Sequence, residues 1–362
     1  IGPGLVGPAV QGGGEIRPLP FVSVVMPVRN EAGFIERSLG SVLTQDYSPD
    51  RMEVIIADGM SGDGTREMVL RLAASDARVT LVDNPGRIAP TALNVAITRS
   101  RGDVVIRVDG HCEIAPDYVS RCVHHLASGE TAGVGGPLET VGQTRVAQVI
   151  AIAMSSGFGV GGAAFRTRKM WTGFVDTVAF PAYTRAALRL AGPYDEELVR
   201  NQDDEYNYRL RERGGRILLA ADVRVRYYGR ASVSSLFRQY FQYGLWKVRV
   251  LQKHPRQMRL RQFVPPVFVA CLLAGAFAAP FAPWARHGLL GVGVAYAVAN
   301  LVASFFSGRV GPFPEVLLLP IVFATLHVSY GVGFLTGLVR FRNRWSETTI
   351  GSPPAGRHEG SA

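Results

Sequence analysis

Three aspartates stand where a carboxylate could take part in chemistry. Asp58 and Asp109 each end a short apolar run and precede a glycine, and Asp203 lies in an acidic stretch much later in the chain. In a chain of alternating strands and helices, the first two mark the carboxyl edge of a parallel sheet, where open α/β folds bind ligands. Such groups can anchor a nucleotide, hold a cation at a diphosphate and deprotonate a hydroxyl. Transfer of a sugar from a nucleotide-diphosphate donor needs all three.

The loop that follows Asp58 carries short polar side chains on a glycine-rich backbone. It reads Asp-Gly-Met-Ser-Gly-Asp-Gly-Thr over residues 58–65, a composition that favours turns and close approach of a ligand. A carboxylate at a strand end can accept hydrogen bonds from a base or a ribose, so we expect Asp58 to anchor the nucleotide. An ordinary strand-to-helix turn has the same composition and remains an alternative.

The turn Asp109-Gly-His111 places two metal-binding side chains close together. A divalent cation held there would neutralise the charge that builds up on a departing diphosphate. A capping aspartate beside an incidental histidine is the alternative.

The acidic stretch Gln202-Asp203-Asp204-Glu205 opens a helical pattern. The helix dipole favours acidic residues in a first turn, so a purely structural role is one interpretation. The functional interpretation is that one carboxylate deprotonates an acceptor hydroxyl, which typically contributes roughly 10²–10⁴-fold to a rate.

The elements that must position these residues alternate in type. Apolar, β-branched runs predict strands, and apolar residues at helical spacing predict the helices between them. The predicted strands cover 21–28, 53–57, 79–82 and 103–108, and the predicted helices cover 32–45, 65–74 and 90–98. This order predicts an α/β fold, a parallel sheet with helices on both faces. Further short strands are predicted at 132–136, 174–180, 217–219 and 223–227.

The C-terminal third is apolar and begins with a basic helix. Residues 236–252 combine an apolar face with cations, which suits a helix on a membrane surface, although a packed domain helix is equally compatible with its first half. Apolar segments follow near 263–284, 288–307 and 314–338. Each approaches the ~20 residues that span a bilayer, and their prolines suggest kinks or a re-entrant piece.

The charges that flank these segments conflict with three crossings. Residues 236–261 contain seven cations and no acid, which places that block on the cytosolic side. Arg340, Arg342 and Arg344 place the other end on the same side. Either one segment does not cross, or the tail lies outside despite its arginines.

Composition excludes several other classes. A net charge of +10 with a pI near 9.8 permits nucleic-acid binding, but the adjoining apolar segments favour membrane lipids as the partner. Cys112, Cys122 and Cys271 form no disulfide framework, and the nearby histidines match no zinc pattern. Residues 1–20 show no secretory signal and are expected to be flexible.

Five motifs then occur in the order found in family 2 glycosyltransferases. They are Pro-Val-Arg-Asn30-Glu31, the Asp58 loop, Asp109-Gly-His111, Gln202-Asp203 and Gln242-Tyr-Gly-Leu245-Trp246. The chain resembles these inverting enzymes, which have the GT-A fold, over roughly residues 21–250. Residues 175–177 and 197–205 are most similar to membrane-associated succinoglycan-type exopolysaccharide members.

The resemblance implies a role for each matching residue. Asp203 is the expected catalytic base, Asp109 the expected metal–diphosphate ligand, and Trp246 the expected acceptor contact. The donor pocket is expected to involve Pro27, Asn30, Glu31, Asp58, Arg87, Asn94 and Gln242.

The sequence departs from the family pattern at three places. His111 replaces the usual second metal aspartate, which would favour Mn²⁺ over Mg²⁺. Gln202 replaces a glutamate before the base, and Leu245 replaces an arginine. If the diphosphate still needs a cationic side chain, Lys247, Arg238 or Arg249 must supply it.

These observations predict four parts after the flexible N-terminal segment 1–20, and one activity. A GT-A domain over 21–230 precedes an amphipathic basic region at 231–262, a membrane region at 263–340 and a polar tail at 341–362. We expect a multi-pass membrane protein whose cytosolic head transfers a sugar from a nucleotide-diphosphate donor, most simply a UDP-sugar, to a lipid-linked saccharide or polysaccharide. The cofactor is Mn²⁺ or Mg²⁺.

Other activities remain open at this stage. A polyprenyl-phosphate sugar synthase and a processive polysaccharide synthase would use the same donor chemistry. A transporter or scaffold with an inactive head is the non-enzyme alternative. His327 is the single ionisable residue inside the apolar segments, which is too few for an ion or substrate pathway. A nucleic-acid binder is the weakest alternative.

Overall fold

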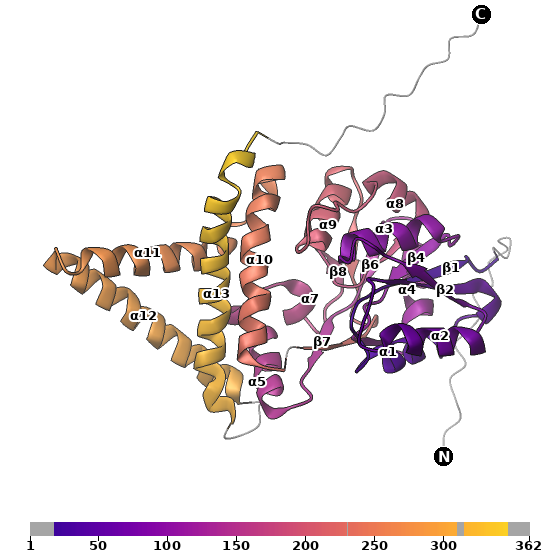
Figure 1. Ribbon diagram of the computed structural model, residues 1–362, viewed down its shortest axis with the longest axis horizontal. Coiled ribbons are helices and arrows are strands. Elements are labelled where there is room, and N and C mark those ends of the chain that lie inside the picture. The colour runs from indigo at the N-terminus through magenta and orange to yellow at the C-terminus, as the bar shows by residue number, and fades with distance from the viewer. Residues whose placement is uncertain (1–17, 230, 310–314, 347–362) are drawn as a thin grey trace, which may run out of the picture.

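The computed structural model describes residues 18–229, 231–309 and 315–346, and comprises an α/β head and a C-terminal helical part (Figure 1). Most of the predicted segments 1–20 and 341–362, and residue 314, lie outside the described residues. The strands are β1 Val22–Val28, β2 Met52–Asp58, β3 Val79–Asp83, β4 Val104–Arg107, β5 Cys112–Ile114, β6 Gly133–Gly135, β7 Leu138–Val141, β8 Gly173–Phe174, β9 Ala182–Thr184, β10 Ile217–Leu219 and β11 Val225–Tyr228. The helices of the head are α1 Ile35–Leu43, α2 Thr65–Ser75, α3 Ala89–Arg99, α4 Tyr118–Leu126, α5 Arg145–Met154, α6 Gly157–Val160, α7 Ala164–Thr167, α8 Arg185–Ala191 and α9 Gln202–Glu212, and the C-terminal helices are α10 Val233–Lys253, α11 Val264–Ala278, α12 Pro283–Gly308 and α13 Leu319–Arg340.

The main sheet has the strand order β3-β2-β1-β4-β9-β6-β10-β8. Its first four strands are parallel, β9 runs antiparallel to both β4 and β6, and β8 runs antiparallel to β10. The central strand β1 is almost wholly apolar and buried, as expected for a parallel strand covered on both faces. A smaller sheet has the order β5-β11-β7. The predicted mostly parallel α/β fold is confirmed.

Helices cover both faces of the main sheet. Residues of α1, α2 and α4 share one apolar core with alternate residues of β1, and residues of α3, α8 and α9 share the core on the other face. Two consecutive residues show the alternation, because Val24 belongs to the first core and Val25 to the second. The loops at one edge of the sheet are therefore held by cores on both sides.

The prediction of a strand at 174–180 is largely wrong. Only Gly173–Phe174 forms a strand, and the chain returns to the sheet at β9. The strands β5, β7 and β9 were not predicted. Each has three or four residues, too few for an apolar alternation to stand out from loop sequence.

The C-terminal helices match the predicted apolar segments closely. The helix α10 runs beside α13, and α11 and α12 point away from this pair (Figure 1). Within the described residues, three helices are long and apolar enough to cross a membrane, by length and composition alone. Their prolines begin helices or lie in the turn between α11 and α12 rather than kinking them.

The cations of α10 differ from the sequence expectation. They were expected to face lipid, but Lys247 and Arg249 are buried and paired with carboxylates of the head. The helix therefore lies inside the protein for much of its length. Its exposed cation Arg238 lies near the N-terminal end.

Candidate active site

The edge of the main sheet brings the first two aspartates together. Val28 at the end of β1 is in register with Asp58 at the end of β2, and β4, which precedes Asp109, pairs with β1 on its other side. The parallel register therefore places both carboxylates at one edge. The N-terminus of α9 brings Asp203 to the same place, as its contacts show.

One arginine connects two of the three aspartates. Arg107, the last residue of β4, is buried, and its Nε and Nη2 donate to the two carboxylate oxygens of Asp109 at 2.7 and 3.0 Å. Its Nη1 donates to Oδ1 of Asp203. A single guanidinium thus bridges residues that are far apart in the sequence.

The charges at this bridge shift two pKa values. Burial alone would lower the pKa of Arg107, but the charges of Asp109 and Asp203 hold it well above its usual value. Burial raises the pKa of the Asp203 carboxyl, the Arg107 guanidinium opposes that shift, and the charge of Asp109 adds to it. Asp203 is therefore a stronger base than an ordinary aspartate, which suits removal of a proton.

Asp58 is the last residue of β2, and the loop that follows the strand covers its side chain. It is fully buried and accepts hydrogen bonds from the backbone and hydroxyl of Ser61, and Arg66 pairs with it at 3.2 Å. Asn30 joins the same loop, since its backbone donates to Ser61 and its side chain accepts from Gly62. Asn30 has a φ of 55°, in the left-handed region that asparagine tolerates. The structure thus brings the Asn30 and Asp58 motifs together.

Glu31 and His111 form a second connection across the site. Nδ1 of His111 lies 2.8 Å from Oε1 of Glu31, which makes Nε2 the nitrogen through which the ring could bind a metal. Metal-binding histidines usually hold a carboxylate on the other ring nitrogen, so this pair fits that role. Gly110 permits the approach, because a Cβ there would lie 2.9 Å from Cγ of Glu31.

Few side chains at the site could act as ligands of a metal ion. The described residues contain no group of three or more His, Cys, Asp or Glu side chains that could hold a metal. Asp109 and His111 would supply at most two ligands, and both oxygens of Asp109 already contact Arg107. Phosphate oxygens would complete the coordination, as they commonly do where a cation is bound together with a nucleotide.

Comparisons with known proteins decide the family. The model described as glycosyl transferase family 2 matches residues 23–189. The succinoglycan biosynthesis protein ExoA of Rhizobium meliloti is 34% identical over 332 residues, which cover 89% of this chain and 96% of that protein. The chain belongs to glycosyltransferase family 2.

A more distant relative of this family 2 glycosyltransferase and a solved structure of similar fold were also found. A Methanococcus voltae enzyme, named as a dolichyl N-acetyl-α-D-glucosaminyl phosphate 3-β-D-2,3-diacetamido-2,3-dideoxy-β-D-glucuronosyltransferase, is 25% identical and covers 64% of this chain and 74% of its own. The structure of the mannosyltransferase PcManGT from Pyrobaculum calidifontis, in complex with GDP-Man and Mn²⁺, superposes with a TM-score of 0.55 at 22% identity and covers 87% of each chain. That likeness agrees with the GT-A fold.

The other predicted donor contacts of the glycosyltransferase have structural partners. Asn94 of α3 donates to the carbonyl of Tyr194 and to Glu196, and it accepts from the backbone of Tyr194. The side-chain amide of Asn94 therefore holds the loop that contains Tyr194 and Glu196. A contact between Asn94 and a nucleotide would have to replace these hydrogen bonds. The carbonyl of Arg87 accepts from Arg29, and Pro27 is half-buried in β1.

Gln242 and Trp246 lie one turn apart on α10. The indole Nε1 of Trp246 donates to Gln242 at 3.2 Å, and its ring packs against Phe341 at a centroid distance of 5.5 Å. Two neighbouring residues of α10 contact the turn that carries Asp203: the carbonyl of Tyr243 accepts from Asn201, and Lys247 pairs with Asp204. The helix α10 thus flanks the turn that carries Asp203.

Sequence reasoning missed the cation that the site contains. Lys247 and Arg249 were proposed to replace the missing arginine at Leu245, but their charges are neutralised by Asp204 and Glu197. Arg107 is instead the guanidinium that contacts Asp109 and Asp203. The sequence did contain a signal for this contact: Arg107 lies in an otherwise apolar strand, and a buried charge is rarely left unpaired.

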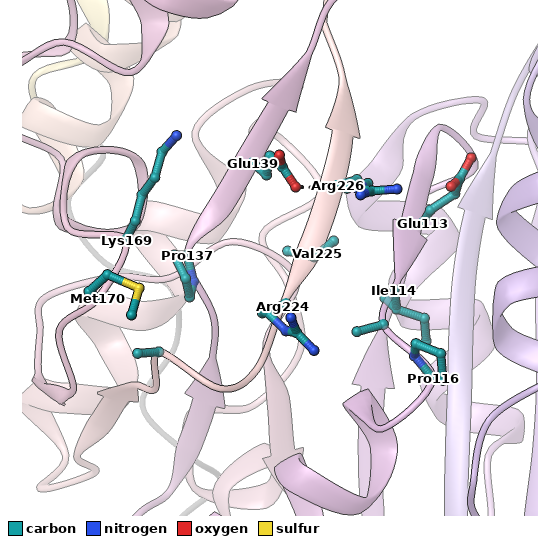
Figure 2. Close-up of a pocket in the computed structure, with 12 residues that line it drawn as sticks. Glu113, Ile114, Pro116, Pro137, Glu139, Lys169, Met170, Arg224, Val225 and Arg226 are labelled. Atoms are coloured by element: carbon teal, nitrogen blue, oxygen red, sulfur yellow. Dashed lines mark hydrogen bonds and ion pairs between the residues drawn. The ribbon is translucent and has the colours of Figure 1, made fainter. Parts of the chain in front are cut away.

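A separate cavity lies over the small sheet. It measures about 520 Å³ and is lined by residues in and beside β5, β7 and β11, among them Glu113, Glu139 and Arg226 (Figure 2). None of the three aspartates lines it. The candidate site is therefore defined by the converging motifs and not by this cavity.

Proposed function

We propose that the protein is an inverting, membrane-attached glycosyltransferase that uses a nucleotide-diphosphate sugar. The observation that carries this proposal is the Arg107 bridge, which sets Asp203 beside Asp109 at the edge where Asp58 ends β2. A base, a diphosphate site and a nucleotide anchor are then neighbours. This is the set of groups that the sequence motifs predicted.

The transfer takes place in one displacement. Asp203 accepts the proton of an acceptor hydroxyl, whose oxygen forms a bond to the anomeric carbon as the bond to the diphosphate breaks. Attack on the face opposite the leaving group inverts that carbon, so no covalent sugar–enzyme intermediate forms. Arg107 keeps Asp203 in position through its hydrogen bond to Oδ1.

Asp109 and Nε2 of His111 would hold a divalent cation, with Glu31 orienting the imidazole. Such a cation, when bound, neutralises charge on the leaving diphosphate. An imidazole ligand favours Mn²⁺ over Mg²⁺. The complex of PcManGT with GDP-Man and Mn²⁺ supports both the cation and the type of donor.

The acceptor is proposed to be a lipid-linked saccharide or a polysaccharide, reached from the cytosolic face of the membrane. Three helices of membrane-spanning length support attachment to the bilayer. The relative from Methanococcus voltae is named for a dolichyl-linked acceptor, and ExoA is named for succinoglycan biosynthesis. The donor is proposed to be a UDP-sugar.

Replacement of the proposed base tests the reaction. Asp203→Asn should lower the rate of transfer by roughly 10²–10⁴-fold, because the amide cannot accept the proton. Binding of the donor should persist, since Asp58 and Asp109 are unchanged. The assay measures nucleotide release from a panel of nucleotide sugars, with and without a chelator, in membranes that contain each variant.

The neighbouring Asp204→Asn is the matched control, because that carboxylate pairs with Lys247 rather than with Arg107. Undiminished turnover by Asp203→Asn would remove the assigned base. Unchanged rates after chelation would remove the cation. A single sugar joined through a phosphodiester, as the product, would indicate a polyprenyl-phosphate sugar synthase.

A further inference from the structure

The helix α13 is long enough to cross a membrane, but its surroundings are those of a packed helix. It runs parallel to α10 along most of its length: Leu236 lies in one apolar cluster with Val322 near the start of both helices, and Gln252 donates to the carbonyl of Phe341 near their ends. Figure 1 shows the two helices side by side. About 44% of its most apolar stretch is buried inside the protein, against 11% for α11 and for α12.

Glycines bring the backbones of α10 and α13 into contact. A Cβ on Gly244 would collide with the carbonyl oxygen of Tyr330, and a Cβ on Gly333 would collide with that of Phe241. Small residues at such contacts allow helices to approach closely. The two helices therefore form one unit, and α13 cannot enter the bilayer without α10.

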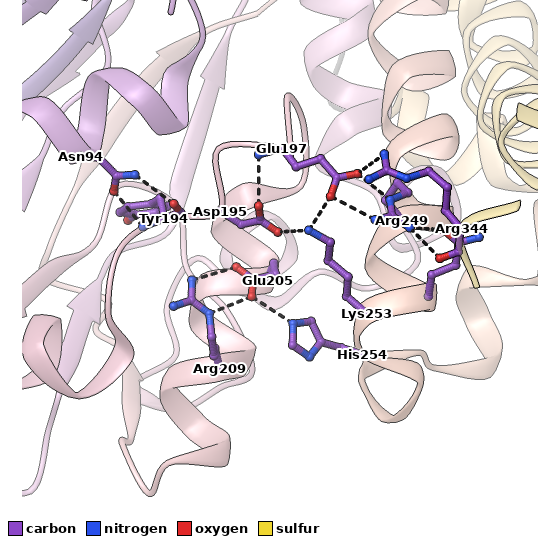
Figure 3. Close-up of polar contacts among 11 residues, drawn as sticks. Asn94, Tyr194, Asp195, Glu197, Glu205, Arg209, Arg249, Lys253, His254 and Arg344 are labelled. Atoms are coloured by element: carbon purple, nitrogen blue, oxygen red, sulfur yellow. Dashed lines mark hydrogen bonds and ion pairs between the residues drawn. The ribbon is translucent and has the colours of Figure 1, made fainter. Parts of the chain in front are cut away.

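The helix α10 is in turn attached to the soluble head. Arg249 binds Glu197 with contacts of 2.6 and 3.0 Å, and Lys253 reaches both Asp195 and Glu197 (Figure 3). Lys247 pairs with Asp204 next to the proposed base. If α13 crossed the membrane, it would carry this row of charges and the adjoining head into hydrocarbon. Placing even single charges there is costly.

The helices α11 and α12 have the opposite character. Large apolar side chains are exposed along both of them, such as Leu273, Phe277 and Phe305, and these two helices point away from the α10–α13 pair (Figure 1). The apolar helix 260–278 has 19 residues and α12 has 26. At 1.5 Å per residue these are about 28 Å and 39 Å long, against a hydrocarbon core of about 30 Å, and the 15 residues of α11 itself account for about 22 Å of the first.

The helices α11 and α12 form a hairpin, and polar residues lie at both of its ends. Arg259 and Arg261 precede α11 and Arg309 follows α12, so cations lie at its base. At the tip, Arg286 donates to the carbonyls of Ala279 and Pro280. The adjacent Trp284 is exposed, as is common where a helix meets the membrane surface.

We propose that α11 and α12 cross the bilayer as a hairpin, and that α13 lies along its cytosolic surface between the hairpin and α10. The chain then crosses the membrane twice. The basic residues before α11 and the arginines after α13 are on one side, which removes the conflict found in the sequence. The inference rests on the proposed membrane attachment but not on sugar transfer.

Contacts between α12 and α13 hold the hairpin in place. Asn300 donates to the carbonyl of Pro320 at 2.9 Å, and the hydroxyl of Tyr296 lies 2.9 Å from Nδ1 of His327. His327 also contacts the carbonyl of Phe158 in the head. These bonds are polar and join the middle and the C-terminal half of α12 to α13.

Cysteine labelling in intact cells tests the topology. In a Cys271→Ser background, which removes the exposed cysteine, single cysteines are placed at exposed positions: Arg256→Cys on the head side, His287→Cys at the tip and Asn343→Cys after α13. A membrane-impermeant maleimide should label position 287 from outside. Positions 256 and 343 should be labelled only after the membrane is permeabilised.

Each outcome bears on a different claim. Labelling of position 343 from outside means that α13 crosses, and it overturns the proposal. No labelling of position 287 from outside overturns the crossing of the hairpin. Recovery of the protein in the soluble fraction would instead refute membrane attachment, and none of these results depends on activity.

Discussion

At the scale of single residues, the position of Arg107 has the largest consequence for the chemistry. Its guanidinium contacts both Asp109 and Asp203 and is almost completely buried. Without it the negative charge of Asp109 would act unopposed on Asp203 and raise the pKa of the Asp203 carboxyl further. Arg107 therefore acts as a positioning residue that also keeps the proposed base ionised.

The pH dependence of transfer tests this role. Asp203 must be deprotonated to act, so activity falls as the pH drops through its pKa. Arg107→Met should move that acid limb to higher pH by roughly 1–3 units, because the guanidinium opposes the upward shift. The measurement is the profile of kcat/KM against pH.

Arg107→Lys retains the charge and should move the limb less. Arg121→Met, at a half-exposed ion pair on α4, serves as the control for loss of an arginine. An acid limb that stays at the same pH in Arg107→Met, in a folded protein, contradicts the assigned role.

At the scale of elements, the contact between α10 and the loop before α9 joins the head to the helical part. Burial alone would raise the pKa of Glu197, but hydrogen bonds and charges from Arg249 and Lys253 lower it to about 2. Arg344, after α13, reaches the same carboxylate at 2.7 Å. One acidic side chain therefore connects the head with two helices that are far apart in sequence.

Glu197→Gln should destabilise this contact. Loss of the charge leaves the buried Arg249 poorly compensated, so we expect a loss on the order of 2 kcal/mol near pH 7, below the ~3–5 kcal/mol of a fully buried pair since Glu197 is partly exposed. The lowered pKa means that wild-type protein gains this stability above about pH 4.5 and loses it towards pH 2. Thermal unfolding in detergent at several pH values measures it.

The difference between variant and wild type should shrink as the pH falls below that range, because the glutamate is then neutral as well. Glu139→Gln, at an exposed ion pair with Arg226, should change stability little at any pH. A difference that is constant with pH would show that Glu197 acts through something other than its charge.

At the scale of the whole molecule, the exposed apolar surface is concentrated on one part. The head and the α10–α13 pair bury most of their large apolar residues, and α11 and α12 expose most of theirs. An exposed apolar surface of this extent would drive aggregation in water, so a bilayer is the environment in which the fold is complete. The helical hairpin is thus expected to determine membrane attachment.

Two leucines provide a matched comparison for that expectation. Leu273 on α11 and Leu70 on α2 are 61% and 50% exposed. Leu273→Arg should weaken insertion, since an arginine near the centre of a membrane helix costs about 2.5–3.5 kcal/mol on insertion scales. Leu70→Arg lies on the head and should have no such effect.

The measurement is the fraction of protein that stays in the membrane pellet after an alkaline carbonate wash. Equal retention of both variants would contradict the assignment of α11 to the bilayer.

Local patterns in the sequence determined the strand–helix order, the edge that carries Asp58 and Asp109, and the apolar helices. These follow from residue spacing, because neighbours along the chain decide which face of an element is buried. Tertiary structure alone decided that Arg107 bridges Asp109 and Asp203, that Lys247 and Arg249 turn inward, and that α13 packs against α10. Such contacts join residues far apart in the chain, and charge or hydropathy in a segment does not reveal which partner will cover it.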